Sequence, residues 1–369
     1  MDSSVLIAAA EALPAAPWVF RVLLDVSFTA HILLVNVMLG LSLLGFVRSL
    51  GGSWNGGTPP APDMAALAGP IPNATALAVN LGIAPLLFLQ ALYGQFLYVS
   101  STLMGGYWFA IVPAVMAAYG LSYRQKAASA RRSGRGRLLW GLMSILLLAV
   151  SLAQTNNAVL LADPNLWSGY FDNPSPSGTL TAWGDPTLIP RWLHFVAASL
   201  ALGGLALAMA GRGRTRKAAR KGDPEAVAAG ESLEALGLGW FAWATLAQAV
   251  DGLWFLVSLP RPVRLAFLGD DGLATALMAS GLCLALATLA LAFRGRLMPA
   301  AASALATVAA MVAIRDESRD LCLAPYFEVD KLPVRPEYST LALFLVCLVL
   351  ALTAVAWAVR TPAGNRKGA

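Results

Sequence analysis

The sequence predicts an all-α, polytopic membrane bundle with about nine transmembrane helices. Hydrophobic residues make up 58% of the 369 residues and charged residues only 12%, and the mean hydropathy is +0.66. A soluble domain contains about 25% charged residues, so this composition is typical of a membrane protein. In addition, runs of about 18 or more mainly apolar residues recur along the chain, and a helix of that length crosses a bilayer.

The apolar runs follow one another through 22–359 and indicate a single membrane domain over 1–369. Residues 1–21 are expected to form an interfacial lead-in, and residues 360–369 a cytoplasmic tail. The predicted spans are 22–47, 76–100, 105–123, 137–160, 190–211, 235–258, 273–293, 297–314 and 338–359.

Basic residues orient the predicted spans. They gather in the loops that follow the third, fifth and seventh spans and in the tail, and all of these lie on one side of a nine-span bundle. By the positive-inside rule this side is cytoplasmic, which places the N-terminus outside and the C-terminus in the cytoplasm. The net charge of +6 is therefore a topology signal and does not indicate nucleic-acid binding. The residues are Arg124, Lys126, Arg131, Arg132, Arg135, Arg137, Arg212, Arg214, Arg216, Lys217, Arg220, Lys221, Arg294, Arg296, Arg360, Arg366 and Lys367.

The cysteines and histidines exclude several kinds of metal site. Cys283, Cys322 and Cys347 are far apart and show neither CxxC nor CxxCH spacing, which argues against zinc, a covalently attached haem and a disulfide framework. The chain has only two histidines and no HExxH motif, so a site built from several histidines is not available either.

Both histidines lie inside predicted spans. His31 stands in RVLLDVSFTAHILLVNVMLGLSLLGF and His194 in RWLHFVAASLALGGLALAMA. An imidazole in hydrocarbon is costly to bury and therefore usually has a partner or a task. A frequent task in helical membrane bundles is axial ligation of haem iron. The alternative is a hydrogen bond to a neighbouring helix.

The expected depths pair His194 with a methionine. His194 lies about four residues into the fifth span and Met278 about five residues into the seventh, and both spans enter from outside. An imidazole and a thioether at similar depth can ligate one low-spin haem from opposite faces, although a methionine in an apolar helix is often only a filler. His31 lies deeper in the outer half, and Arg21 precedes it near the boundary, where a guanidinium can pair with a haem propionate.

Two further polar segments invite functional hypotheses. Asp251 lies within the sixth span, where an acid can relay protons, accept a hydrogen bond from a quinol or pair with a neighbouring helix. The segment 315–337, RDESRDLCLAPYFEVDKLPVRPE, is expected to form an external loop. Its mixed charges fit either a dock for a redox partner or a solvated, self-paired loop.

The order of these segments resembles subunit I of cytochrome bd quinol oxidases over most of the chain. Arg21 followed by AHILLVNVMLGLSLLGF looks like the family's first helix, and RWLHFVAASLALGG is similar to the segment around its low-spin haem histidine. ALMASGLCLALA matches the helix that carries the methionine ligand, at Met278. QAVDGLWFLVSLPRPVRLAFLG resembles the start of the quinol-binding loop, with Arg264 in place of a quinol-contacting lysine.

The sequence departs from the family where acids are expected. The third helix, GGYWFAIVPAVMAAYGLSY, has Val112 and Gly120 near the positions of two proton-conducting glutamates. The eighth helix has Leu305 or Ala306 near a haem-ligating glutamate, and the Gly-Arg-Gln-Pro-Trp signature is missing. A quinol-loop glutamate falls near Gly269, beside Asp270 and Asp271. Because apolar residues neither deliver protons nor ligate iron, the chain looks poorly equipped to reduce oxygen alone.

The resemblance therefore implies a haem b-binding membrane subunit that transfers electrons between quinol and an external carrier such as a cytochrome c. Haem b is expected in one or two copies, with a chlorin-type haem d left open. The expected ligands are His31, His194 and Met278, with Arg21 at a propionate and Asp251, Arg264 and Asp270 at the quinol. A second multi-span subunit and a bacterial-type cytoplasmic membrane are also implied. A genuine oxygen-reducing quinol oxidase and a haem-free structural subunit remain the alternatives.

Overall fold

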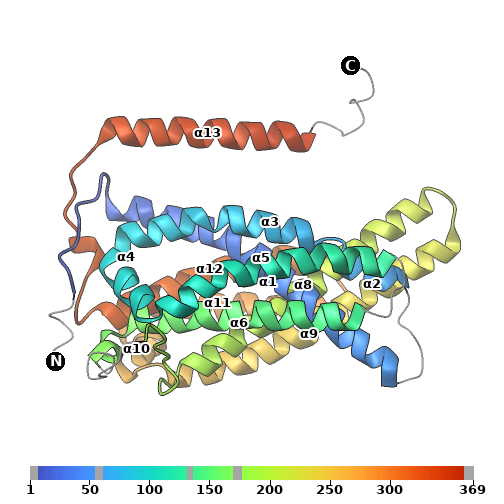
Figure 1. Cartoon of the computed structure of the whole chain (residues 1–369), viewed down its shortest axis with the longest axis horizontal. Coiled ribbons are helices and arrows are strands. Elements are labelled where there is room, and N and C mark those ends of the chain that lie inside the picture. The colour runs from blue at the N-terminus through green and yellow to red at the C-terminus, as the bar shows by residue number, and fades with distance from the viewer. Residues whose placement is uncertain (1–6, 55–60, 131–135, 169–176, 361–369) are drawn as a thin grey trace.

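Helices build the structure, a computed structural model that describes residues 7–54, 61–130, 136–168 and 177–360. The long helices run side by side along one axis (Figure 1). Within the described ranges, the only β-type backbone pairing is an isolated bridge between Leu13 and Val334. The prediction of an all-α bundle is thus confirmed. The helices are α1 (Pro17–Trp54), α2 (Ala61–Ala68), α3 (Ile71–Leu81), α4 (Ile83–Leu103), α5 (Gly105–Ala130), α6 (Gly136–Ala162), η2 (Pro164–Trp167), α8 (Leu188–Ala219), α9 (Pro224–Ser258), α10 (Arg261–Leu265), η3 (Ala266–Asp270), α11 (Gly272–Phe293), α12 (Leu297–Leu323), η4 (Val329–Lys331) and α13 (Tyr338–Arg360).

Each predicted span coincides with a long helix, or with the pair α3 and α4 in the case of 76–100. Seven stretches of the described chain are long and apolar enough to cross a membrane, which makes the chain a multi-pass membrane protein. α5 and α13 occupy the predicted third and ninth spans but are not among the seven. The total of nine spans and the orientation of the termini therefore stay predictions. The seven stretches are Pro17–Leu50, Met64–Leu103, Gly136–Ala162, Leu188–Ala219, Pro224–Ser258, Gly272–Phe293 and Leu297–Leu323.

Two predicted boundaries differ from the structure. α1 begins at Pro17, so Arg21 lies inside this helix and not in a lead-in. α12 continues through Leu323, so the expectation that 315–323 belongs to an external loop was wrong. The charged residues of this segment stay helical because they pair with one another and with α1 inside the bundle. Residues 361–369 of the expected tail lie outside the described residues.

Glycines bring α8 and α9 close together along their antiparallel contact. Gly204 and Gly211 on α8 face Gly237 and Gly230 on α9. A Cβ atom at Gly237 would lie 2.3 Å from the backbone nitrogen of Ala208, well inside contact distance. Small residues are typical of such interfaces in membranes, where van der Waals packing and not hydrophobic burial drives helix association. This contact sets how α8 and α9 place their functional side chains relative to each other.

α1 runs through the middle of the bundle and contacts α3, α4, α6, α8 and α12. It meets α8 at Gly40, where a Cβ atom would lie 1.8 Å from the carbonyl oxygen of Ser199. One turn of helix away, the buried Ser199 hydroxyl donates a hydrogen bond to the Asn36 side chain over 2.7 Å. The close approach and the polar bond together fix the register between α1 and α8.

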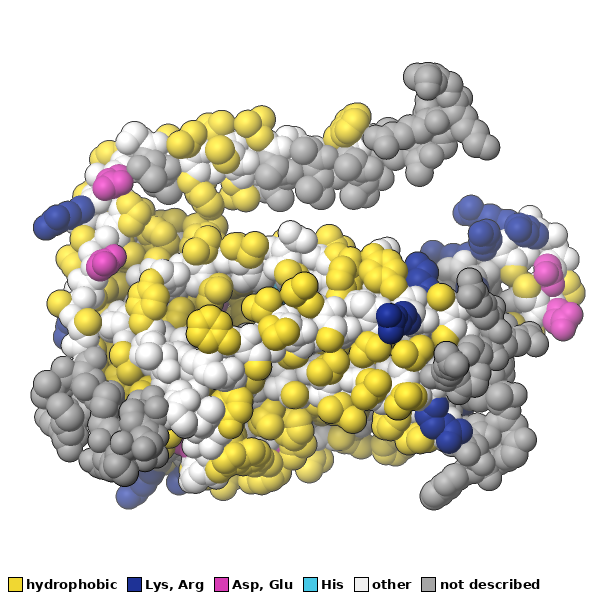
Figure 2. Space-filling model, in the orientation of Figure 1, with side chains coloured by type: hydrophobic (Ala, Val, Ile, Leu, Met, Phe, Trp, Pro, Cys, Tyr) yellow, Lys and Arg dark blue, Asp and Glu magenta, His cyan; other side chains and the backbone are white. Residues whose placement is uncertain are grey.

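The surface agrees with a membrane-embedded bundle. Figure 2 shows hydrophobic side chains along the length of the bundle, with Lys and Arg toward its ends. α13 stands away from the other helices in Figure 1, and a ring contact between Phe344 and Phe88, with centroids 6.3 Å apart, links it to α4. Several of its apolar side chains are exposed, namely Leu343, Leu345, Val346, Val349, Leu350 and Trp357.

The α8–α9 contact predicts a large difference between two glycines of α9. Gly237→Ala is expected to lower the free energy of unfolding by about 1–3 kcal/mol, because its methyl group would overlap the α8 backbone. Gly239→Ala is the matched control, since nothing lies within 4 Å of a Cβ atom there. Thermal unfolding of the two variants in detergent measures the difference. Equal midpoints would contradict the close approach of the two helices.

Candidate functional site

Both histidines and Met278 lie toward the same end of the bundle, which the positive-inside rule assigns to the outside. His194 stands six residues after Leu188, the first residue of α8. Met278 also stands six residues after the first residue of its helix, α11. Since α8 and α11 begin at the same end of the bundle, their matched depth agrees with the expectation from the sequence.

His194 is held between α8 and α9. Its Nδ1 atom lies 3.3 Å from Oδ2 of Asp251, and both atoms are buried without a hydrogen bond. Its Nε2 atom lies 3.2 Å from the side-chain nitrogen of Gln248. Because an amide nitrogen only donates, Nε2 carries the lone pair and Nδ1 carries the proton that faces Asp251. Gly252 leaves room for the ring, since a Cβ atom there would lie 3.2 Å from Cε1 of His194.

His31 is held between α1 and the junction of α3 with α4. Its Nδ1 atom lies 2.9 Å from the carbonyl oxygen of Ala78. Because a carbonyl only accepts, Nδ1 carries the proton and Nε2 keeps its lone pair. Gly82 makes space for this ring as well, since a Cβ atom there would lie 2.8 Å from Cε1 of His31.

A metal-ligating imidazole usually donates its second N–H to a carboxylate or carbonyl, and this bond fixes the tautomer and the ring. His31 makes such a bond to the carbonyl of Ala78. His194 has the carboxylate of Asp251 3.3 Å from its Nδ1 atom, without a hydrogen bond. Histidine and methionine are both residue types that can serve as axial ligands of haem iron. In the part of the chain that the structure describes, no three His, Cys, Asp or Glu side chains converge on a metal position.

Met278 belongs to the apolar cluster next to His194. It packs with Phe255 against the buried residues Val263 and Phe267. The rings of Phe255 and His194 in turn contact each other, with centroids 6.3 Å apart. Phe255 thus contacts His194 and packs against the same apolar cluster as Met278, the two expected ligands of the low-spin haem.

A buried ionic network lies between α1, α4 and α12, and only Arg21 of it was expected from the sequence. Arg21 pairs with Asp320 over 2.8 Å, and Arg319 pairs with Asp316 over 2.9 Å. The side chains of Arg319 and Asp316 are only 7% and 5% exposed. Tyr93 donates a hydrogen bond to Asp320, and the guanidinium of Arg319 lies over the Tyr93 ring, 4.0 Å from its centroid.

The network reaches His31 through one cation–π contact. Arg315, which lies 3.5 Å from Asp316, places its guanidinium over the ring of Phe28, 4.3 Å from the centroid. The Phe28 ring contacts the His31 ring, with centroids 6.2 Å apart. The charged network and this histidine are therefore separated by a single aromatic ring.

A second cation–π contact repeats this arrangement at His194. The guanidinium of Arg191 lies over the Phe255 ring, 5.1 Å from the centroid, and Phe255 contacts His194. The Nε atom of Arg191 is buried and has no hydrogen-bond partner. Arg191 of α8 and Arg315 of α12 thus each lie over an aromatic ring that contacts one of the two histidines.

Sequence reasoning missed the network because 315–337 was taken as one loop. A signal was present: Arg315 and Arg319, like Asp316 and Asp320, are four residues apart. If the helix of the predicted eighth span continues through this segment, that spacing places the two arginines on one face of the helix and the two aspartates on one face as well. Arg21 was expected at a haem propionate, and the structure places it against Asp320.

The three expected quinol residues have different neighbours. Asp251 faces His194. Arg264 donates a hydrogen bond to the carbonyl of Val257 over 2.7 Å, across the turn from α9 to α10. Asp270 is exposed at the end of η3. The structure brings none of these three side chains into contact with another.

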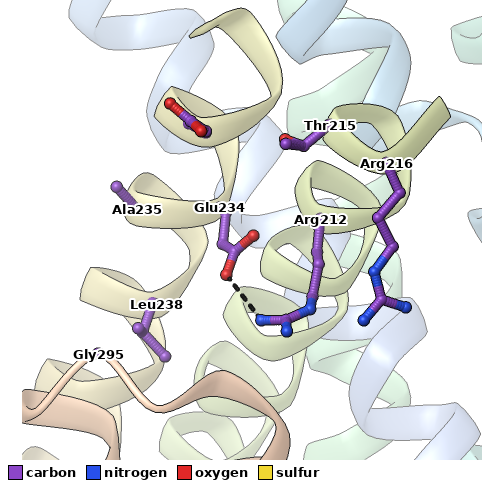
Figure 3. A pocket seen from close by; sticks show the side chains of 8 residues that line it. Arg212, Thr215, Arg216, Glu234, Ala235, Leu238 and Gly295 are labelled. Atoms are coloured by element: carbon purple, nitrogen blue, oxygen red, sulfur yellow. Dashed lines mark hydrogen bonds and ion pairs between the residues drawn. The ribbon is translucent and has the colours of Figure 1, made fainter. Parts of the chain in front are cut away.

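A surface pocket occurs at the other end of α8 and α9 (Figure 3). In Figure 3 Arg212 turns toward Glu234, and the two side chains form an ion pair of 3.4 Å. Arg212 lies 18 residues beyond His194 on α8, or about 27 Å along the helix, so the pocket is remote from both histidines. The pocket is lined by Arg212, Thr215, Arg216, Glu231, Glu234, Ala235, Leu238 and Gly295.

The burial of the ionic network predicts a strong effect on stability. Arg319→Met is expected to lower the free energy of unfolding by about 3–5 kcal/mol, because it leaves Asp316 buried without its closest counter-charge. Lys331→Met is the matched control, since its ion pair with Glu328 is exposed, and about 1 kcal/mol or less is expected. Chemical unfolding of both variants in detergent measures the two values. Similar values would mean that the network does not stabilise the bundle.

The architecture has a counterpart among solved structures. The chain superposes on a chain from the structure of bd oxidase from Geobacillus thermodenitrificans with a TM-score of 0.68, over 94% of this chain and 97% of that one. The two sequences are 15% identical, so this likeness shows the fold alone. No family model and no curated protein sequence matches the chain. The chain is therefore a multi-pass membrane protein with a bd-oxidase-like fold.

Proposed function

We propose that the chain is a haem b-binding membrane subunit of a bd-oxidase-like respiratory complex, which transfers electrons between quinol and an external carrier or partner subunit. One observation carries this proposal. On a bd-oxidase-like fold, Nδ1 of His31 donates a hydrogen bond to the carbonyl of Ala78, and Nδ1 of His194 lies 3.3 Å from the buried carboxylate of Asp251. An imidazole held in this way is oriented to ligate iron.

His194 and Met278 are the proposed axial ligands of one haem b, and His31 is the proposed ligand of a second. A bound haem would supply a centre that accepts and donates single electrons. The protein contributes the orientation of the ligands: the carbonyl of Ala78 holds the His31 ring by a hydrogen bond, and Gln248 and Asp251 lie against the His194 ring. The alternative at His31 is a chlorin-type haem d, which the visible spectrum would distinguish from haem b.

Arg191 is the better proposed partner for a haem propionate than Arg21. Arg21 is already engaged by Asp320 at 2.8 Å and lies 4.0 Å from Asp330. Arg191 stands one turn before His194 on α8, and its buried Nε atom has no hydrogen-bond partner. A carboxylate of the ligand would satisfy this donor, and guanidinium groups match carboxylates well.

The quinol is proposed to bind near the turn from α9 to α10. Asp251 has the chemistry to accept a hydrogen bond from a quinol hydroxyl, and it already lies against His194. Arg264 and Asp270 belong to the segment that follows this turn, Arg264 at the end of α10 and Asp270 at the end of η3. Oxidation of a quinol there would deliver electrons next to the proposed low-spin haem.

A second multi-span subunit and an external cytochrome c or similar carrier are the proposed partners, in a bacterial-type cytoplasmic membrane. The structural likeness to a bd oxidase chain supports membership of a membrane complex. The exposed apolar side chains of α13, such as Leu350 and Trp357, fit a lipid or helical environment outside the bundle.

A quinol oxidase that reduces oxygen itself is the second candidate function. Reduction of oxygen to water consumes protons, and the helix expected to deliver them, α5, contains no acid. The structure instead holds the buried Asp316 on α12 and the half-buried Asp25 on α1. These carboxyl groups favour this candidate function, and oxygen-dependent quinol oxidation by the purified complex is the experiment that decides for it.

The proposed ligation predicts the haem content of two variants. The purified protein is expected to show b-type bands in the reduced-minus-oxidised visible spectrum, and His194→Ala to lose the low-spin α band and one haem per chain. A pyridine haemochrome assay counts the haem, and Arg212→Gln, remote from both histidines, serves as the control. A folded but colourless protein would leave only the haem-free structural subunit.

The methionine ligand is tested separately. Met278→Leu conserves size and hydrophobicity but removes the sulfur, so the low-spin band is expected to weaken or shift while the haem is still retained by His194. Met298→Leu, at the other end of the bundle in α12, is the matched control and is expected to leave the spectrum unchanged. An unchanged spectrum in Met278→Leu would exclude Met278 as a ligand.

A further inference from the structure

The surface pocket between α8 and α9 has the form of a binding site that the proposed function does not use. Its volume is about 510 Å³, within the range of small-ligand sites. Its walls come from α8, α9 and the turn between α11 and α12 (Figure 3). Gly295 holds this turn with a φ of +71°, and the next N–H, that of Arg296, donates to the carbonyl of Leu291 over 3.0 Å. Segments far apart in sequence thus form one concave surface.

The charge of Arg212 in this pocket is only partly engaged. Its guanidinium lies 3.4 Å from the carboxylate of Glu234, and the two side chains are 36% and 23% exposed. The Nε atom of Arg212 is buried and has no hydrogen-bond partner. Because a guanidinium carries five N–H donors, this single contact leaves Arg212 with donors for a further acceptor.

Three more arginines add positive charge in and beside the pocket. Arg216, one turn after Arg212 on α8, also lines it. Arg294 and Arg296 stand on either side of the glycine in the turn. Among the residues that the structure describes, no acid lies within 4.0 Å of the guanidinium groups of these three. The four arginines outnumber the two glutamates of the lining, so the local field favours an anion.

The pocket lies at the level of lipid headgroups. Arg212 stands 24 residues after Leu188, the first residue of α8, or about 36 Å along the helix. The hydrocarbon core of a bilayer is about 30 Å thick, so a helix that enters near Leu188 carries Arg212 just beyond the core. The positive-inside rule assigns this end of the bundle to the cytoplasm.

An apolar surface continues from the pocket toward the membrane core. Ala235 and Leu238 line the pocket on α9, and Trp243 follows on the same helix. The Trp243 ring contacts the ring of Phe293, which stands two residues before Gly295, with centroids 5.5 Å apart. The two aromatic side chains are 65% and 52% exposed. Exposed aromatic rings near the boundary of a membrane are typical of contact with lipid.

We propose that this pocket binds the phosphate group of an anionic ligand, with Arg212 and Arg216 as its hydrogen-bond donors. Guanidinium groups match phosphate oxygens bidentately. A lipid headgroup and a free phosphate compound offer the same chemistry. The rings of Trp243 and Phe293 favour the lipid, since its acyl chains would lie along them. Basic pockets between helices on the cytoplasmic side are typical sites for anionic headgroups. The site does not depend on the proposed haem.

Native mass spectrometry of the purified full-length protein tests the site, after delipidation in detergent and titration with phosphatidylglycerol. The wild type is expected to bind one phosphatidylglycerol more tightly than phosphatidylcholine with the same acyl chains. Arg216→Gln is expected to weaken this binding by about fivefold, the factor that one basic residue contributes near an anionic lipid. Lys217→Gln is the matched control, because Lys217 is the exposed neighbour outside the lining, and it is expected to keep the wild-type affinity.

Both variants remove an exposed charge, so both are expected to unfold at the wild-type temperature before lipid is added. Arg212→Gln is a second variant of the lining and is expected to weaken the binding as well. Equal affinities of Arg216→Gln and Lys217→Gln for phosphatidylglycerol would overturn the site. The absence of any preference over phosphatidylcholine in the wild type would overturn it too.

Inorganic phosphate distinguishes the two sources of the phosphate group. With chloride at equal ionic strength as the reference, phosphate is expected to raise the unfolding temperature of the delipidated protein much less than phosphatidylglycerol does. It is also expected to leave the first phosphatidylglycerol bound. If phosphate stabilises the wild type as strongly as the lipid, displaces the lipid and has no effect on Arg216→Gln, the ligand is a free phosphate compound and the lipid is overturned.

Discussion

The ionic network of α1, α4 and α12 is the interaction on which this end of the bundle depends. A charge in hydrocarbon must be paired, and removing one partner leaves the other without compensation. Arg21 of α1 and Asp320 of α12 meet this requirement across helices that are far apart in sequence, and Arg319 and Asp316 meet it within α12. Because Asp320 binds both Arg21 and Tyr93, it holds α1 and α4 against α12. The same pairs place Arg315 beside the ring that contacts His31.

The positions of the histidines follow from packing between small residues. Gly40 brings α1 against α8, and the glycines of α8 and α9 bring those two helices together. These contacts leave His194 opposite Asp251 and His31 opposite the carbonyl of Ala78. The carbonyl of Ala78 accepts from Nδ1 of His31, and the Gln248 amide donates to Nε2 of His194, so the tautomer of each imidazole is set by the helix that packs against it. The chemistry of each ring is thus a consequence of helix packing.

The buried acids of this chain lie at other places than the glutamates of the bd oxidase family that the sequence resembles. α5 contains no carboxylate, and the haem-ligating glutamate of the eighth helix is also replaced in the sequence. The buried acids lie instead on α1 and at the end of α12, where arginines surround them. The likeness to a bd oxidase chain concerns the course of the backbone. The site built on that backbone has its own distribution of charge, and function is argued from the site.

Hydrophobic periodicity and length by themselves determined the membrane class and the approximate places of the helices, because crossing a bilayer requires about 20 apolar residues wherever they occur. The sequence also singled out His31 and His194, since imidazoles inside apolar spans are rare, and Met278 by its expected depth beside His194. Only the tertiary structure decided what surrounds them. The approach of Asp251 to His194 and the ion pair of Arg21 with Asp320 join separate helices, and no pattern local to one segment encodes such contacts. The end of α12 was predicted wrongly for the same reason. Its charged residues are typical of a solvated loop when the segment is considered alone, and only the tertiary structure brings their partners on α1 and α4 against them.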